Sequence, residues 1–227
     1  MNGDNIGSRL KKKAFHHGDL KEAAFVAVAN LADKHRSLEF TLSDVANILG
    51  TTQPALYKHF ADRTDLLTAT ALKGHDIFIE IRRGALEGMT GGPLAELIAF
   101  ANSYVVFAAQ HQGFYLLIRF FQFKGELKSE AYQPYLDNTI TQLRSIIQRG
   151  IDEGLFNESD IGLIAASTNI TWTGLSNNVI SGNTARLMGK SAEDAELSET
   201  MIRLSLSVFL SPKGKRRLAA LPYLSLA

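Results

Sequence analysis

The chain contains no cysteine among its 227 residues. This absence excludes a disulfide framework and zinc sites with cysteine ligands, and it is typical of proteins from a reducing compartment. The charges nearly cancel, because 24 lysine and arginine residues face 23 aspartate and glutamate residues, which leaves a formal net charge of +1. Any contact with nucleic acid must therefore come from a local cluster of basic residues and not from the overall charge.

Signals for membranes and for catalysis are also missing. No apolar run reaches the ~20 residues needed to cross a bilayer, and no apolar segment follows the basic residues near the start, so we expect a cytoplasmic protein. The sequence has no P-loop, no dinucleotide glycine fingerprint, no Gly-x-Ser-x-Gly elbow and no His-Glu-x-x-His motif. We therefore expect neither an enzyme nor a cofactor. His16 and His17 are adjacent, but sequence neighbours point in different directions and no third ligand is evident, so we expect no metal site.

What the sequence does contain is a stretch at residues 41–60, TLSDVANILGTTQPALYKHF, that predicts two short helices joined by a tight turn. Thr41 and Asp44 have the spacing of a capping box at the start of the first helix. Gly50 is suited to end that helix, because glycine readily adopts the left-handed conformation of a sharp stop. Two helices with glycine in the turn are typical of a helix-turn-helix, whose second helix enters the major groove of DNA.

The second of these helices has an apolar and a polar side. Thr52 is its candidate N-cap, and Pro54 is tolerated in the first turn, where an N–H has no helical partner. Leu56 and Phe60 are expected to face inward. The side chains that remain on the outside are those of Gln53, Tyr57, Lys58 and His59. A helical hairpin inside an ordinary bundle is the alternative, but an aromatic ring beside a cation and an amide favours DNA binding.

At these residues the chain closely resembles the DNA-binding domain of the TetR family of bacterial transcription regulators. The matching positions are Thr41, Val45, Ala46, Gly50, Thr52, Leu56, Tyr57, His59, Phe60, Arg63, Leu66 and Leu67. Thr51 departs mildly, since the family more often has valine or isoleucine there. The resemblance is specific over residues 19–67, and it implies that Thr41, Tyr57 and Arg63 hold the DNA backbone. The residues expected to meet DNA are Thr41, Thr51, Thr52, Gln53, Pro54, Tyr57, Lys58, His59 and Arg63.

The remaining segments are predicted to be helical, and none shows the alternation of a strand, so we predict an all-α fold. Residues 1–18 are expected to form a flexible basic arm, 19–67 a three-helix helix-turn-helix domain, 68–212 a helical bundle for effector binding and dimerisation, and 213–227 a tail. The arm carries Arg9, Lys11, Lys12 and Lys13, which would follow DNA phosphates; the alternative is a merely solvated tail.

The predicted helix at residues 160–181 has one side of small residues, which would let another helix approach closely. These residues are Gly162, Ala166, Thr173, Gly174 and Asn177. The alternative is core packing within one monomer, but the family resemblance favours a homodimer interface made by this helix and the predicted helix at 192–210. A dimer is also expected because one short recognition helix reads few base pairs.

Aromatic residues from several predicted helices of the C-terminal bundle suggest a small-molecule site, although they could equally fill a core. Polar residues surround Trp172 in the helix at 160–181, and apolar cavities with a few orienting polar groups are the usual form of such a site. Charges are few on the inward faces, with Arg119 the main exception, so we expect an uncharged, mostly apolar effector. The candidate ligand-binding residues are Phe78, Tyr104, Phe107, Phe114, Phe121, Tyr135, Asn169 and Trp172.

Together these features predict a dimeric transcriptional repressor that a small effector releases from a near-palindromic operator in double-stranded DNA. The alternative is a DNA-binding protein that is controlled by a protein partner, or that organises chromosomes, without a small-molecule effector.

Overall fold

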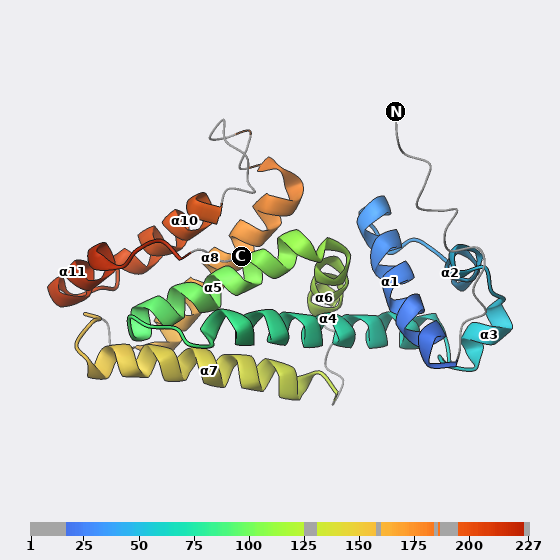
Figure 1. Ribbon diagram of the computed structural model, residues 1–227, viewed down its shortest axis with the longest axis horizontal. Helices are drawn as coiled ribbons and strands as arrows, with labels where there is room; N and C mark the ends of the chain where they lie inside the picture. The colour runs from blue at the N-terminus through green and yellow to red at the C-terminus, as the bar shows by residue number, and fades with distance from the viewer. Residues whose placement is uncertain (1–16, 125–130, 158–159, 184–185, 187–194, 225–227) are drawn as a thin grey trace. The chain divides into compact units, whose positions relative to one another are not determined.

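The computed structural model describes residues 17–124, 131–157, 160–183, 186 and 195–224 (Figure 1). These residues are mostly helical, and strand pairing within them is confined to an isolated antiparallel bridge between Phe156 and Leu210. The prediction of an all-α fold is confirmed. Residues 1–16 of the predicted basic arm, including His16, lie outside the described residues, whereas residues 17 and 18 belong to the first helix.

Contacts divide the chain into two compact units. The first comprises Met1–His75 and Gln112–Ser129, and the second comprises Asp76–His111 and Glu130–Ala227. The division falls inside helix α4 (Arg63–Leu86), so one continuous helix contributes residues to both units. Residues 112–124, which the sequence analysis placed in the C-terminal domain, make their contacts within the first unit. The sequence-based boundaries at residues 67 and 212 remain predictions.

The first unit holds the helix-turn-helix. Its helices are α1 (His17–His35), α2 (Leu42–Leu49), α3 (Gln53–Tyr57), the first part of α4, and α6 (Gln112–Lys124). Helix α1 packs against both α2 and α6, and α2 packs against α3. A Cβ atom at Gly113 would lie 1.9 Å from the carbonyl oxygen of Ala29, so α6 approaches the backbone of α1 too closely for any larger residue.

Helix α2 starts and stops as its sequence predicts. The backbone N–H of Thr41 donates to Oδ2 of Asp44 at 2.7 Å, and the backbone N–H of Asp44 donates to Oγ1 of Thr41 at 3.2 Å, which completes the capping box. The first of these bonds, as the main cause, lowers the pKa of Asp44. Gly50 ends the helix with φ 63°, in the left-handed region. Leu42, Val45, Ala46 and Leu49 are buried, as the apolar stripe predicts.

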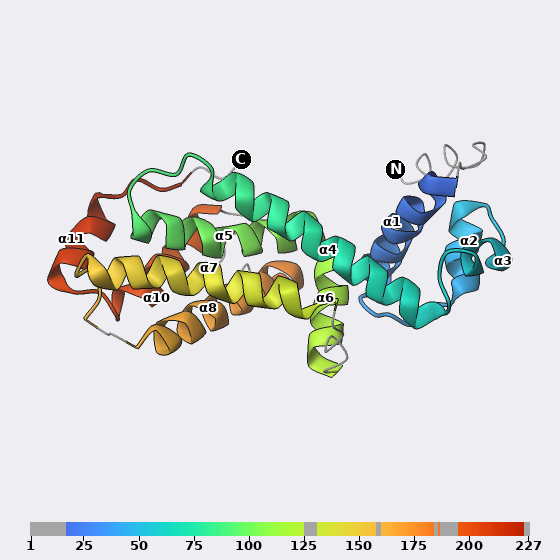
Figure 2. The ribbon, with the colours of Figure 1, turned by 90° about the horizontal axis from the view of Figure 1, so that it is seen from below.

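The second unit is built around α5 (Pro93–Gln110), which is buried along most of its length. Helices α7 (Gln133–Asp152) and α8 (Ile161–Ser181) pack against α5 and against each other (Figure 2). Helix α10 (Ala195–Ser207) packs against α5 and α8. A helix in contact with several others needs apolar residues around its whole circumference, which the sequence of α5 provides.

Residues 212–220, which the sequence analysis placed mostly in a tail, form helix α11 (Pro212–Ala220). Ser211 caps it by accepting a hydrogen bond from the backbone N–H of Gly214 at 3.0 Å. Leu218 is buried, and Nη1 of Arg203 donates to its carbonyl oxygen at 3.0 Å. The apolar signal of this short, basic helix is weak, so its place depends on contacts with α5 and α10 that sequence patterns do not show.

Candidate functional site

Helix α3 presents a polar surface on a firmly anchored backbone. Leu56 is fully buried and Phe60 is 2% exposed, whereas Tyr57 is 52% exposed. Gln53 lies one turn before Tyr57, on the same side of the helix, and is exposed as well. Lys58 follows the helix and is also exposed. An amide and a phenol are thus exposed on one side of α3 and an ammonium group at its end, and all three can form hydrogen bonds with base edges or phosphates.

Three details around α3 differ from the sequence-based expectation. Thr52 occupies the N-cap position, but its side chain makes no capping hydrogen bond. The helix ends at Tyr57, so His59 lies beyond it and is half-buried, with its ring centroid 6.3 Å from that of Phe60. Thr51 is half-buried too, while Pro54 and Thr41 are exposed. The prediction assumed that the helix continues over His59 and points its side chain outward. In the structure His59 lies beside the buried Phe60 and is therefore half-buried.

Arg63 has an internal role in the structure. Its Nε donates to the carbonyl oxygen of Phe40 at 2.8 Å, and its Nη2 donates to that of Leu38. The guanidinium also lies over the Phe40 ring, 5.5 Å from the centroid. The first turn of α4 is thereby joined to the segment that leads into α2. The family resemblance assigned Arg63 to the DNA backbone, and this internal role was not visible in the sequence.

Four of the eight candidate ligand-binding residues come together in the second unit. The ring centroid of Phe78 lies 5.1 Å from that of Tyr104 and 5.6 Å from that of Phe107. Trp172 joins the cluster at 6.1 Å from Tyr104. All four side chains are buried. The packing of these rings therefore supplies an aromatic core around α5.

The other four candidates lie elsewhere. Phe114 and Phe121 are buried in the first unit. Tyr135 donates its hydroxyl hydrogen to Oδ1 of Asp76 at 2.8 Å, and this bond is the main cause that raises the pKa of Tyr135. Asn169 is exposed on α8. A ligand-binding role for the eight residues remains a prediction.

Hydroxyl groups on α8 find their hydrogen-bond acceptors among the backbone carbonyl groups of the same helix. The hydroxyl of Thr168 donates to the carbonyl oxygen of Ile164 at 2.7 Å, and that of Ser176 donates to the carbonyl oxygen of Trp172 at 2.8 Å. Thr171 likewise donates to the carbonyl oxygen of Ser167 at 3.0 Å. These hydroxyls therefore do not need a ligand as a hydrogen-bond partner.

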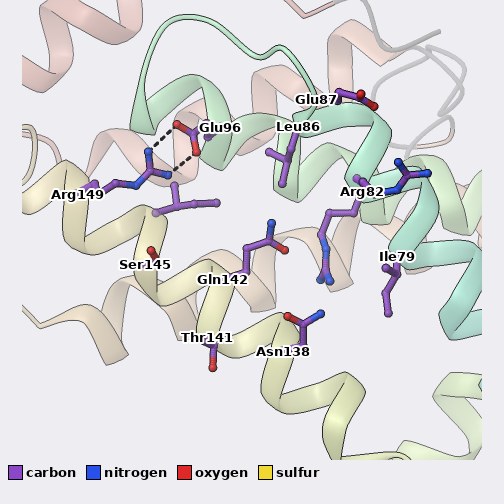
Figure 3. Close-up of a pocket in the computed structure, with 12 residues that line it drawn as sticks. Ile79, Arg82, Leu86, Glu87, Glu96, Asn138, Thr141, Gln142, Ser145 and Arg149 are labelled. Carbon is purple, nitrogen blue, oxygen red and sulfur yellow. Dashed lines mark hydrogen bonds and ion pairs between the residues drawn. The ribbon is translucent and has the colours of Figure 1, made fainter.

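A groove of about 830 Å³ opens between α4, α5 and α7 of the second unit (Figure 3). It is lined by Ile79, Arg82, Arg83, Leu86, Glu87, Glu96, Asn138, Thr141, Gln142, Ser145, Ile146 and Arg149. None of the eight candidate residues is among them. Arg149 and Glu96 form a two-bond ion pair in the groove, with Nη1 2.8 Å from Oε1. The residue types and the volume are both suited to a small polar or amphipathic molecule.

Arg82 is the residue that the sequence analysis missed. The residue is 2% exposed, and its guanidinium lies 5.1 Å from the ring centroid of Phe78 and 5.0 Å from that of Phe100. Nη1 donates to Oγ1 of Thr139 at 2.8 Å. Burial lowers the pKa of Arg82 to about 10, so the group remains charged at neutral pH. The spacing of the residues could have predicted its burial, because Arg82 comes four residues after Phe78 and so lies on the same inward side of α4.

Helices α8 and α10, which pack against each other, leave apolar side chains exposed. The exposed fractions are 49% for Leu163 and 71% for Ile170 on α8, and 38% for Met201, 58% for Leu204 and 72% for Val208 on or directly after α10. A Cβ atom at Gly174 would meet no atom within 4 Å. We call this set the α8–α10 apolar surface. Exposed apolar side chains gathered on adjacent helices are typical of a protein–protein interface.

Within the described ranges we find neither a membrane-spanning helix nor a cluster of metal ligands. No helix there is long and apolar enough to cross a membrane. No group of three or more histidine, cysteine, aspartate or glutamate residues in those ranges is placed to hold a metal ion.

The chain is similar to known proteins in structure and not detectably in sequence. No family model matches the sequence, and no curated protein is significantly similar to it. Among solved structures, a TetR family transcription regulator from Marinobacter aquaeolei VT8 matches with a TM-score of 0.67 and 14% identity, over 85% of this chain and 96% of that one.

Two further solved structures carry more specific descriptions. KstR2, a ketosteroid transcriptional regulator of Mycobacterium tuberculosis, has a TM-score of 0.61 and 17% identity, and the match covers 88% of this chain and 98% of that one. SmeT, the repressor of the multidrug efflux pump SmeDEF of Stenotrophomonas maltophilia, has a TM-score of 0.60 and 14% identity, over 91% and 95% of the two chains. The chain therefore has the fold of TetR family transcription regulators.

Proposed function

We propose that the protein is a dimeric transcription regulator of TetR type that binds a near-palindromic DNA operator through α3. The observation that carries this proposal is the exposed pair Gln53 and Tyr57 on a short helix anchored by the fully buried Leu56. A recognition helix needs such an arrangement, because its backbone must be rigid while its polar side chains stay free for base edges. Gln53 would read bases, and Lys58 would contact a phosphate or a guanine.

Dimerisation is supported by the α8–α10 apolar surface. Five large apolar side chains at 38–72% exposure are costly in a monomer and would be covered by a second copy. The open space at Gly174 would let the partner helix come close. Two recognition helices would then read two half-sites, which gives the affinity that one five-residue helix lacks.

Control by a small molecule completes the proposal. An effector bound in the second unit would favour a conformation whose recognition helices no longer match successive major grooves, so the regulator would act as a repressor released by its effector. Helix α4 is the connecting element, because it begins at Arg63 in the first unit and carries Phe78 and Arg82 in the second. We expect most of the effector to be apolar, in keeping with the aromatic cluster.

The test begins with selection of DNA ligands from a random duplex library, followed by sequencing and titration. The expected result is a near-palindromic site bound by two protomers in the nanomolar range, with weaker binding to scrambled duplex. Selection of no preferred sequence would contradict the proposal. Screening of apolar compounds by thermal shift then separates effector control from control by a protein partner, since only a ligand of the folded protein raises the melting temperature.

A further inference from the structure

Arg82 lines the groove between α4, α5 and α7, yet it is almost fully buried. Its only hydrogen bond to the described residues runs from Nη1 to Thr139, and no acid among them pairs with it. The Thr139 hydroxyl donates in turn to the carbonyl oxygen of Tyr135 at 2.9 Å, so the orientation of this acceptor is fixed. A guanidinium has five N–H donors in a planar fork, and this bond uses one of them.

The other two arginines of the groove are neutralised by acids. Arg83 pairs with Glu80, and Arg149 pairs with Glu96. Asp76, the remaining acid near the start of this part of α4, accepts the hydroxyl of Tyr135. Glu87, the other acid of the lining, is not paired with Arg82, so Arg82 is the arginine of the groove that forms no ion pair with a described residue. Figure 3 shows its side chain reaching from α4 toward α7, on the side where Asn138 and Gln142 lie.

A buried cation without an acid is costly, and its cost is compensated only in part by the aromatic rings on which it lies. The rings of Phe78 and Phe100 lie close to the guanidinium but offer no conventional hydrogen-bond acceptor. A planar anion that accepts two parallel N–H groups would supply both the charge and the acceptors. A carboxylate has this geometry.

We infer that the groove binds a small organic carboxylate, with its two oxygen atoms on the guanidinium of Arg82 and its apolar body along Ile79, Leu86 and Ile146. The identification of this ligand as the effector rests on the proposed function, whereas the anion site itself does not. The inference replaces the expectation of an uncharged effector with that of an amphipathic one. Amide and hydroxyl groups of Asn138, Gln142 and Ser145 are available to bind further polar atoms of the ligand.

The experiment compares matched pairs of probes: octanoate with octanamide, and 2-naphthoate with 2-naphthamide. Each pair has the same apolar body and a planar head group that differs in charge. Isothermal titration of the full chain should show that at least one carboxylate binds about tenfold or more tightly than its amide, as expected for a charge-assisted bidentate pair. Equal binding of both members of each pair, or no binding by either carboxylate at millimolar concentration, would overturn the inference.

Variants test whether Arg82 causes the preference for the carboxylate over the amide. Arg82→Met keeps the length of the side chain and removes the charge, and it should reduce carboxylate affinity about tenfold or more while leaving amide affinity unchanged. Arg82→Lys should retain part of the preference. The matched control is Arg144→Met, the same substitution at an exposed position of α7 outside the groove. Circular dichroism and melting curves verify folding, and Thr139→Val, which removes the acceptor that orients Arg82, should show a smaller loss.

A separate readout distinguishes this inference from the proposed function. Release of the selected operator is measured by fluorescence anisotropy with the same probes. If the carboxylate binds through Arg82 and the operator stays bound, the anion site stands and its role as an effector site fails. If the protein selects no operator, the proposed function fails and the titration still decides the anion site. A carboxylate preference that persists in Arg82→Met would refute the assignment in either case.

Discussion

The Nε of Arg63 donates to the carbonyl oxygen of Phe40 at 2.8 Å, across 23 residues of sequence. Arg63 begins α4, and Phe40 comes two residues before α2, so this bond connects the helix that enters the second unit to the entrance of the helix-turn-helix. A change in the position of the first turn of α4 would therefore move the start of α2 as well. In the proposed coupling between effector and DNA, this bond is the contact through which α4 would act on the helix-turn-helix.

Replacement of Arg63 by methionine should lower the free energy of unfolding of the first unit by about 1–3 kcal/mol, because two carbonyl groups lose a charged donor. Urea denaturation followed by far-ultraviolet circular dichroism measures this loss. The control is Lys58→Met, at an exposed position of the same unit, which should weaken DNA binding without a change in stability. Wild-type stability of Arg63→Met would show that the two hydrogen bonds contribute little.

Tyr57→Ala should abolish operator binding and leave the helical content intact. Tyr57 is 52% exposed, so truncation opens no cavity in the core. Anisotropy titration with the selected duplex gives the affinity, and circular dichroism gives the helicity. The matched control is Phe123→Ala, at a residue of α6 in the same unit that is 79% exposed; this variant should bind DNA normally. Normal binding by Tyr57→Ala would remove α3 from the proposed interface.

Deletion of residues 1–13 should weaken binding to every DNA sequence and reduce its dependence on salt. For each DNA phosphate that Arg9, Lys11, Lys12 or Lys13 no longer neutralises, the slope of log affinity against log salt should become shallower by about 0.9. Titrations at several salt concentrations measure the slope. Substitution of the same four residues by alanine in the full chain separates charge from length. If the slope of the truncated protein equals that of the full chain, the segment takes no part in DNA binding.

Gly174→Arg should yield monomers. A side chain at this position enters open space in the isolated chain, so the fold tolerates it, but a large charged group would be forced into the proposed contact between two copies. Sedimentation velocity measures the mass. Gly84→Arg is the control, because Gly84 is also helical with open space around it, and that variant should remain dimeric. A dimeric Gly174→Arg protein would place the interface elsewhere.

Phe78→Ala should keep its operator affinity without effector and lose effector-induced release. The ring touches Tyr104, Phe107 and the guanidinium of Arg82, so its removal disturbs both candidate ligand regions. Because the ring is buried, the variant should also be about 3–5 kcal/mol less stable, and Phe78→Leu offers a milder change. Anisotropy is measured over a range of concentrations of whichever compound releases the wild-type protein. Release of both variants at the wild-type concentration would exclude this route.

The sequence by itself determined the elements whose stabilising interactions are local. The capping box of Thr41 and Asp44, the left-handed Gly50 and the proline in the first turn of α3 each depend on residues within about four positions, so their pattern is readable in the chain. The exposed Gln53 and Tyr57 were predictable for the same reason, because the helical period places them on one side. Apolar stripes likewise predicted the long helices and the all-α class.

Only the tertiary structure decided what depends on partners far apart in the chain. Gly113 meets Ala29, and as a result α6 belongs to the first unit although its sequence reads like the rest of the bundle. Arg82 is buried because Phe78 and Phe100, from two different helices, enclose it, whereas arginine in an isolated sequence is usually assigned to the surface. A periodic pattern states which side of a helix is apolar but not which helix covers it, and the groove between α4, α5 and α7 exists only once those helices are packed.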